Sequence, residues 1–132
     1  MAVVHRTHGA QRFKHRKTFA ARKEESALIR SKYPQKIPVI VERYPGERHL
    51  NSLDRIKFLV PQDVIVSHFI TIIRNRLALS PNQAFYLVVK NRSVSNMYAT
   101  IAELDQEFKD SDGFLYISYA SQEMFGASWT RL

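Results

Sequence analysis

The chain has 132 residues, no cysteine and a formal net charge of +8. This length suits one domain with a single hydrophobic core. The lack of cysteine excludes disulfides, thiol catalysis and cysteine-ligated zinc, and it favours a cytosolic or nuclear protein. No apolar run approaches the ~20 residues of a membrane-spanning helix, and the N-terminus lacks the apolar centre of a signal peptide, so we do not expect export.

The positive charge is concentrated near the N-terminus. Residues 1–32 contain nine Lys and Arg residues against Glu24 and Glu25, a net charge of +7, whereas the remaining hundred residues carry +1. The basicity therefore belongs to an N-terminal segment and not to the rest of the fold. Such a segment favours acidic partners, including acidic peptides, tubulin-like tails, nucleic acid and anionic lipid.

The first quarter of the chain predicts an arm followed by two helices. Residues 1–12 lack periodicity, and we interpret them as a mobile basic arm. Residues 13–18 are predicted to form a short helical turn, and residues 19–32 a helix with Thr18 as its cap. Tyr33-Pro34 ends this helix because the residue before a proline avoids the α conformation.

Residues 36–44 and 55–61 are predicted to form an antiparallel hairpin. In both runs β-branched and aromatic residues alternate with period two, as is typical of strands, and residues 45–51 between them have turn composition. Apolar residues fall on both faces of each strand, so the second face must be covered or must bind a partner. Pro38 cannot donate to a ladder, which predicts that the first strand is an edge or is unpaired there. An exposed edge is either an aggregation hazard or a docking site, and we interpret this one as a first indication of function.

The rest of the chain adds two helices and two strands. In chain order we predict an amphipathic helix over residues 66–77, a strand over 85–89, a polar loop over 91–96, a helix from Thr100 to Phe108 that opens with a Thr100–Glu103 capping box, a turn over 110–113 and a last strand over 114–120. The acidic residues between Glu103 and Asp112 are interpreted as an exposed helix face. One core shared by these elements predicts an α+β domain.

Several long motifs make the chain similar to a known family. They are Phe13-Lys-His-Arg-Lys-Thr-Phe19, Lys36-Ile-Pro-Val-Ile-Val-Glu-Arg-Tyr44, Leu53-Asp54, Lys57-Phe-Leu-Val-Pro61, Ile72-Ile-Arg-Asn-Arg76, Asn82-Gln-Ala-Phe85, Asp112-Gly-Phe-Leu-Tyr116 and Tyr119-Ala-Ser-Gln-Glu-Met-Phe-Gly126. The chain resembles the autophagy-related ubiquitin-like modifiers, in the microtubule-associated protein light-chain-3 branch. The resemblance implies that residues 13–126 form a β-grasp (ubiquitin-like) domain, a four-stranded sheet with two additional N-terminal helices in residues 13–33.

The resemblance also assigns a role to Phe125-Gly126, which alone has the composition of a frayed domain end. In the family a cysteine protease cuts after this glycine, and activating and conjugating enzymes pass its carboxylate to phosphatidylethanolamine. Glycine suits this because an extended tail without a Cβ can thread a narrow cleft. We therefore expect residues 127–132 to be removed, Phe125 to anchor the tail in the enzyme, and the protein to move from the cytoplasm to autophagosomal membranes.

The resemblance further implies two hollows that take an aromatic-x-x-aliphatic peptide motif of autophagy receptors and adaptors. The aromatic side chain would contact Glu25, Ile29, Pro38, Ile40, Lys57, Leu59 and Phe114 (the first group). The aliphatic side chain would contact Phe58, Val60, Pro61, Phe69, Ile72, Ile73 and Arg76 (the second group). The peptide is expected along the edge Lys36–Ile40 with both anchors on one face, and Arg16, Lys36 and Arg55 would pair with its acidic residues. Periodicity alone would make most of the apolar members core residues.

The sequence contains no nucleophile–base pattern and no histidine spacing suited to a metal, so we predict no enzyme, no cofactor and no metal. Two alternatives remain open. The arm could serve a polyanion- or nucleic-acid-binding module, although base stacking lacks aromatic platforms beyond Phe13 and Phe19. The domain could also be a ubiquitin-like interaction module that is never conjugated, in which case Gly126→Ala would change nothing.

Overall fold

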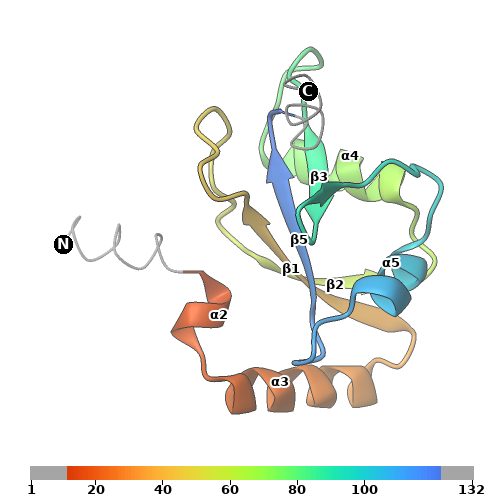
Figure 1. The fold of residues 1–132 in the computed structure, drawn as a ribbon. Helices are drawn as coiled ribbons and strands as arrows, with labels where there is room; N and C mark the ends of the chain where they lie inside the picture. Colours follow the sequence, from red (N-terminus) through yellow and green to blue (C-terminus); the bar gives the residue numbers. More distant parts are fainter. Residues whose placement is uncertain (1–11, 123–132) are drawn as a thin grey trace, which may run out of the picture.

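The computed structural model describes residues 12–122. In that range five strands form one mixed sheet and four helices pack around it (Figure 1). In chain order they are α2 (Phe13–Arg16), α3 (Phe19–Lys32), β1 (Lys36–Arg43), β2 (Lys57–Pro61), α4 (Val66–Arg76), β3 (Tyr86–Val89), β4 (Arg92–Ser93), α5 (Ile101–Phe108) and β5 (Leu115–Ala120). The predicted α+β class is confirmed. No helix within residues 12–122 combines the length and apolar character needed to cross a membrane.

Capping residues define the starts of two helices. The Thr18 hydroxyl accepts a hydrogen bond from a backbone amide in the first turn of α3, at 3.1 Å. Thr100 and Glu103 form the reciprocal capping box of α5, with contacts of 3.1 and 2.8 Å. Both caps confirm the sequence prediction, because capping depends on residues within one turn of the helix.

The strand order is β2-β1-β5-β3-β4. β1 and β5 run parallel, and the other neighbours are antiparallel. The prediction of four strands was wrong by one, since Arg92–Ser93 pairs with β3 as β4. Lys90 and Asn91 have φ angles of 52° and 65°, which suit a two-residue hairpin turn. A polar strand of two residues has no alternation that periodicity could detect.

Helices cover both faces of the sheet. Buried residues of α4 and α5, among them Phe69, Ile73 and Leu104, pack in the main core against one face. On the other face, Phe13 of α2 joins Ile40 and Phe114 in a second buried cluster, and Figure 1 shows α2 and α3 grouped together, apart from α4. The prediction that the second face of the hairpin must be covered or must bind a partner agrees with this packing.

Of the two alternatives predicted for Pro38, the edge strand was wrong, because β1 lies between β2 and β5, and the unpaired amide side agrees with the pairing. Pairing with β5 begins at Val39, one residue after Pro38. Pro38 faces Leu59 of β2, and the bonds Val41 N–H to Ile56 O (2.8 Å) and Gln62 N–H to Gln35 O (3.0 Å) flank that ladder. Because bonded pairs alternate along an antiparallel ladder, Pro38–Leu59 is a non-bonded pair. The missing N–H of Pro38 thus falls where neither neighbour needs it.

Ion pairs fasten α3 to the chain before β5. The fully buried Asp112 pairs with Arg22 and accepts hydrogen bonds from the Tyr116 hydroxyl and a backbone amide. Arg30 binds Asp105 with two contacts of 2.8 and 3.0 Å. The interpretation of these acids as an exposed face was therefore wrong for Asp105 and Asp112, whose cationic partners lie about 75 to 90 residues away in sequence.

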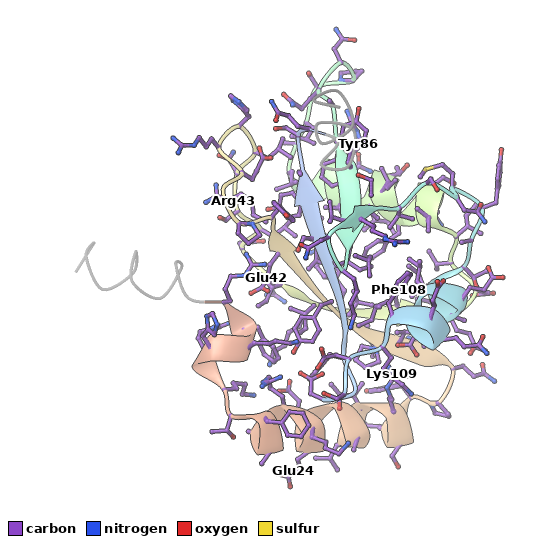
Figure 2. The ribbon with its side chains drawn as sticks, viewed as in Figure 1. Glu24, Glu42, Arg43, Tyr86, Phe108 and Lys109 are labelled. Carbon is purple, nitrogen blue, oxygen red and sulfur yellow. The ribbon has the colours of Figure 1, made fainter. Side chains whose placement is uncertain are left out.

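Helix α2 is fastened to the end of β1. The Phe13 amide donates to the Glu42 carboxylate at 2.8 Å, and Arg12 donates to the Arg43 carbonyl. Figure 2 shows Glu42 and Arg43 beside the start of α2. This attachment holds the Phe13 ring, 1 % exposed, against the same face of the sheet as α3.

Candidate functional site

The free edge near the predicted site belongs to β2. Its outer side has no neighbouring strand in the sheet of residues 12–122. Since Phe58 and Val60 belong to bonded pairs with β1 by the alternation described above, the backbone groups of Lys57 and Leu59 point outward. The edge therefore offers N–H and C=O groups at two positions to an added strand.

The first group assembles on the face that α3 covers. Pro38 faces Leu59 and Ile40 faces Lys57 across the β1–β2 ladder. Ile40 and Phe114 are each 1 % exposed and form the floor, with Ile29 of α3 packed against them. Leu59 is 38 % exposed. The structure thus brings the predicted apolar members together from α3, β1, β2 and the residue before β5, although only the outer ones can touch a ligand.

Glu25 and Lys57 lie at the rim of the first group. The Glu25 carboxylate contacts Nζ of Lys57 and Nζ of Lys17, each at 2.7 Å. Desolvation by burial raises the pKa of Glu25, but the hydrogen bonds from the two lysines lower it by more. The net pKa is therefore below the ordinary value for a glutamate. The Lys57 side chain therefore extends from β2 to α3, and its Nζ also lies 5.3 Å from the Phe13 ring centroid.

The second group assembles on the opposite face of β2. Phe58 and Val60 pack into the main core with Phe69 and Ile73 of α4. The Phe58 and Phe69 rings are 6.1 Å apart at 82°, and the Arg76 guanidinium lies 5.4 Å from the Phe58 ring centroid. Pro61 is exposed and Ile72 is half-buried. Most apolar side chains of this group therefore belong to the main core, and its partly exposed members, Phe58 and Ile72, lie at the edge of that core.

Two expectations about peptide docking were wrong. The segment Lys36–Ile40 is not a free edge, because each of its residues pairs with one residue of β2. The two groups also use opposite faces of β2, since successive side chains of a strand alternate: Lys57 and Leu59 lie on one face, and Phe58 and Val60 on the other. Pro61 of the second group shares the face of Leu59. Anchors three residues apart in an extended peptide point to opposite faces for the same reason. The structure therefore suits this motif spacing better than the same-face arrangement.

The predicted electrostatic residues do not form one cluster. Arg16, Lys36 and Arg55 are all exposed. Lys36 faces Pro61, at the end of β2 away from Arg55, and Arg16 lies 5.9 Å from the Phe13 ring centroid on α2. Positive charge is thus available at both ends of the edge strand.

Sequence reasoning missed two features of this region. It did not include Lys17, whose contact with Glu25 joins residues eight positions apart. It also missed a cavity of about 250 Å³. That cavity is lined by Arg12, Lys14, Tyr44, Pro45, Val88, Lys90, Asn91, Phe108, Asp110, Tyr116 and Ser118. It coincides with neither group, and its lining comes from too many separate segments for a motif to show it.

The predicted processing residues Phe125 and Gly126 lie outside the described residues, as does the predicted arm except for Arg12. The last described strand, β5, ends at Ala120. The structure therefore describes the chain on the N-terminal side of the predicted cleavage point up to Gln122.

Comparisons with known proteins agree with the fold. A family model described as "Autophagy protein Atg8 ubiquitin like" matches residues 21–126. Human microtubule-associated protein 1 light chain 3 gamma is 55% identical over 114 residues, which cover 86% of this chain and 78% of the relative. Protein lgg-2 of Caenorhabditis elegans is 45% identical (86% and 88% covered), and autophagy-related protein 8 of Mycosarcoma maydis is 39% identical (86% and 95%). The chain therefore belongs to the Atg8 family of autophagy-related ubiquitin-like proteins.

Proposed function

We propose that this protein is a modifier that is cleaved after Gly126 and conjugated to phosphatidylethanolamine on autophagosomal membranes. There it recruits receptors and adaptors that carry an aromatic-x-x-aliphatic motif. In this proposal residues 13–126 are the modifier domain, residues 1–12 a basic arm and residues 127–132 the removed tail. The observation that carries the binding role is a free edge strand, β2, with a group of apolar side chains on each of its faces.

The peptide would add to β2 as a further strand. Its main chain would bond the outward backbone groups of Lys57 and Leu59, and its two anchors would turn to opposite faces. The aromatic anchor would lie against Leu59 and Ile29, and the aliphatic anchor against Phe58 on the opposite face. An acidic residue beside the aromatic anchor would compete with Glu25 for Lys57.

The conjugation role is supported by the family match, which runs to residue 126. Ser121 follows β5 directly, and Gly126 is five residues further along. Five extended residues span at most roughly 17 Å, enough to carry a glycine carboxylate away from the domain surface. The chain is the substrate of this chemistry, and the protease and the activating and conjugating enzymes supply the catalytic groups.

Reconstitution tests the proposal. The full-length chain is incubated with the processing protease, the activating and conjugating enzymes, ATP, and vesicles with or without phosphatidylethanolamine, and intact masses are measured. We expect loss of residues 127–132, then a lipid-sized gain only on the phosphatidylethanolamine vesicles. Gly126→Ala should give no lipid product. A wild-type chain left unprocessed while a family relative is converted under the same conditions would contradict the proposal.

The structure weakens the alternative of a polyanion-binding module. Five basic residues in residues 12–32 already engage carboxylates: Arg12 with Glu42, Lys14 with Asp110, Lys17 with Glu25, Arg22 with Asp112 and Arg30 with Asp105. These cations hold the fold together and are less available to a polyanion. Binding through the arm would fall steeply with salt, whereas apolar anchoring would not.

A further inference from the structure

Glu47 binds three separate points of the backbone. This residue lies in the loop between β1 and β2, and its carboxylate accepts hydrogen bonds from the amides of His49 and Leu50, both at 2.9 Å. It also accepts from the amide of Ser121 at 2.7 Å and from the Ser121 hydroxyl at 2.9 and 3.0 Å. A loop residue thus holds a residue 74 positions further along the chain.

Ser121 is the point at which the chain leaves the sheet. The last ladder partners at that end of β5 are Ala120 with Tyr86 and Tyr119 with Arg43. Figure 1 shows the loop after β1 beside the C-terminal end of β5. Beyond Ala120, the carboxylate of Glu47 holds Ser121 in place.

The ionised state of the Glu47 carboxylate suits it to this role. Desolvation by burial raises its pKa, but the hydrogen bonds from Ser121, His49 and Leu50 lower it by more. The net pKa is therefore below the ordinary value for a glutamate. The group is therefore charged at neutral pH, and hydrogen bonds to an ionised acceptor are stronger than neutral ones. A glutamine at this position would keep the shape but lose half of the acceptor capacity.

We propose that Glu47 is a positioning residue for cleavage and conjugation at Gly126, an inference that depends on the proposed function. By holding Ser121 it fixes where the tail leaves the domain, so an enzyme that binds both the domain and the tail meets them already aligned. Ordering one freed backbone residue lowers an equilibrium constant about five- to thirtyfold. Without Glu47 the enzyme would have to order Ser121 itself, at a cost in affinity.

The test compares Glu47→Gln with wild type in protease cleavage of the full-length chain. We expect KM to rise about five- to thirtyfold with kcat little changed, and hydrogen exchange at the Ser121 amide to accelerate. Glu24→Gln is the matched control, because Glu24 is an exposed carboxylate on the outer side of α3 (Figure 2). Ser121→Ala keeps the Glu47 charge and the Ser121 amide but removes the hydroxyl donor, so a smaller rise in KM is expected.

The outcomes separate the two proposals. A wild-type chain that is not cleaved after Gly126 overturns the proposed function, and this inference with it. Normal cleavage of both wild type and Glu47→Gln, despite faster exchange at Ser121, overturns the inference alone. An effect of Glu47→Gln with none from Ser121→Ala also overturns it, because Glu47 would then contact the enzyme directly. If Glu47→Gln does not fold, the comparison of Ser121→Ala with wild type decides.

Discussion

Nζ of Lys57 on the edge strand lies 2.7 Å from a carboxylate oxygen of Glu25 on α3. The Lys57 side chain is 51% exposed and that of Glu25 22%. A pair this exposed contributes about 0–1 kcal/mol, so a ligand can open it. We therefore expect a carboxylate of a bound peptide to replace Glu25 as the partner of Lys57.

Glu25→Gln should favour peptides whose aromatic anchor is preceded by an acidic residue. Lys57 loses its internal partner and pairs with the ligand instead, so we expect a gain of up to about fivefold in affinity. A peptide with a neutral residue at that place should gain less. Calorimetric titration of both peptides measures this.

Glu24→Gln provides the control for that comparison. It removes the same charge from the next position of α3, where the side chain is exposed. Equal gains in the two variants, or equal gains for acidic and neutral peptides, would show that general charge and not the Lys57 contact is responsible.

Peptide addition to β2 should protect alternate backbone amides. The amides of Lys57 and Leu59 point outward, so their hydrogen exchange should slow at least about tenfold on saturation with peptide. The amides of Phe58 and Val60 already face β1 and should change less. Exchange followed residue by residue by NMR would reveal a different docking edge if protection appeared elsewhere.

Leu59→Ala should weaken binding of the aromatic anchor. Leu59 is 38 % exposed, so truncating it should affect ligand affinity more than folding. The expected loss of binding free energy, from the lost apolar contact, is about 1–2 kcal/mol. A peptide with alanine in place of its aromatic residue should bind both forms equally. Leu28→Ala is the control, since Leu28 is 65 % exposed on α3 and belongs to neither group.

The depressed pKa of Glu47 predicts how stability depends on pH. In the unfolded chain this carboxylate titrates near 4.5. Because the folded state holds the ionised form, its contribution is present above that pH and is lost as pH falls through the lower folded pKa. Below about pH 4.5 the free energy of unfolding of wild type should therefore fall more steeply than that of Glu47→Gln. Denaturant titrations from pH 7 to pH 3 test this, and parallel curves would contradict it.

Features that depend on neighbouring residues could be predicted from the sequence. The caps at Thr18 and Thr100 each involve one helical turn, and the β1–β2 hairpin follows from two alternating runs. Both groups of apolar side chains came from a family resemblance, and their members do gather around β2. What failed was the geometry between segments, namely which strand is the edge and which faces the two groups occupy.

Those failures have a physical cause. Pro38 lacks a backbone donor, which on its own suggests an edge strand. A central strand accommodates it because pairing of β1 with β5 begins only at Val39. Asp112 looks like one acid among several, and its burial depends on Arg22, 90 residues away. The role of Glu47 likewise depends on its hydrogen bonds with Ser121, 74 positions further along the chain. Long-range pairing of this kind leaves no local pattern in a single sequence.

The central claim is that Gly126 becomes the carboxyl terminus and is then joined to lipid. The most direct measurement is the intact mass of the N-terminally tagged protein recovered from starved eukaryotic cells, with Gly126→Ala alongside. We predict the loss of residues 127–132 together with a lipid-sized addition, both absent from the variant. A mass that still includes Leu132, in cells whose own family members are lipidated, would contradict the account.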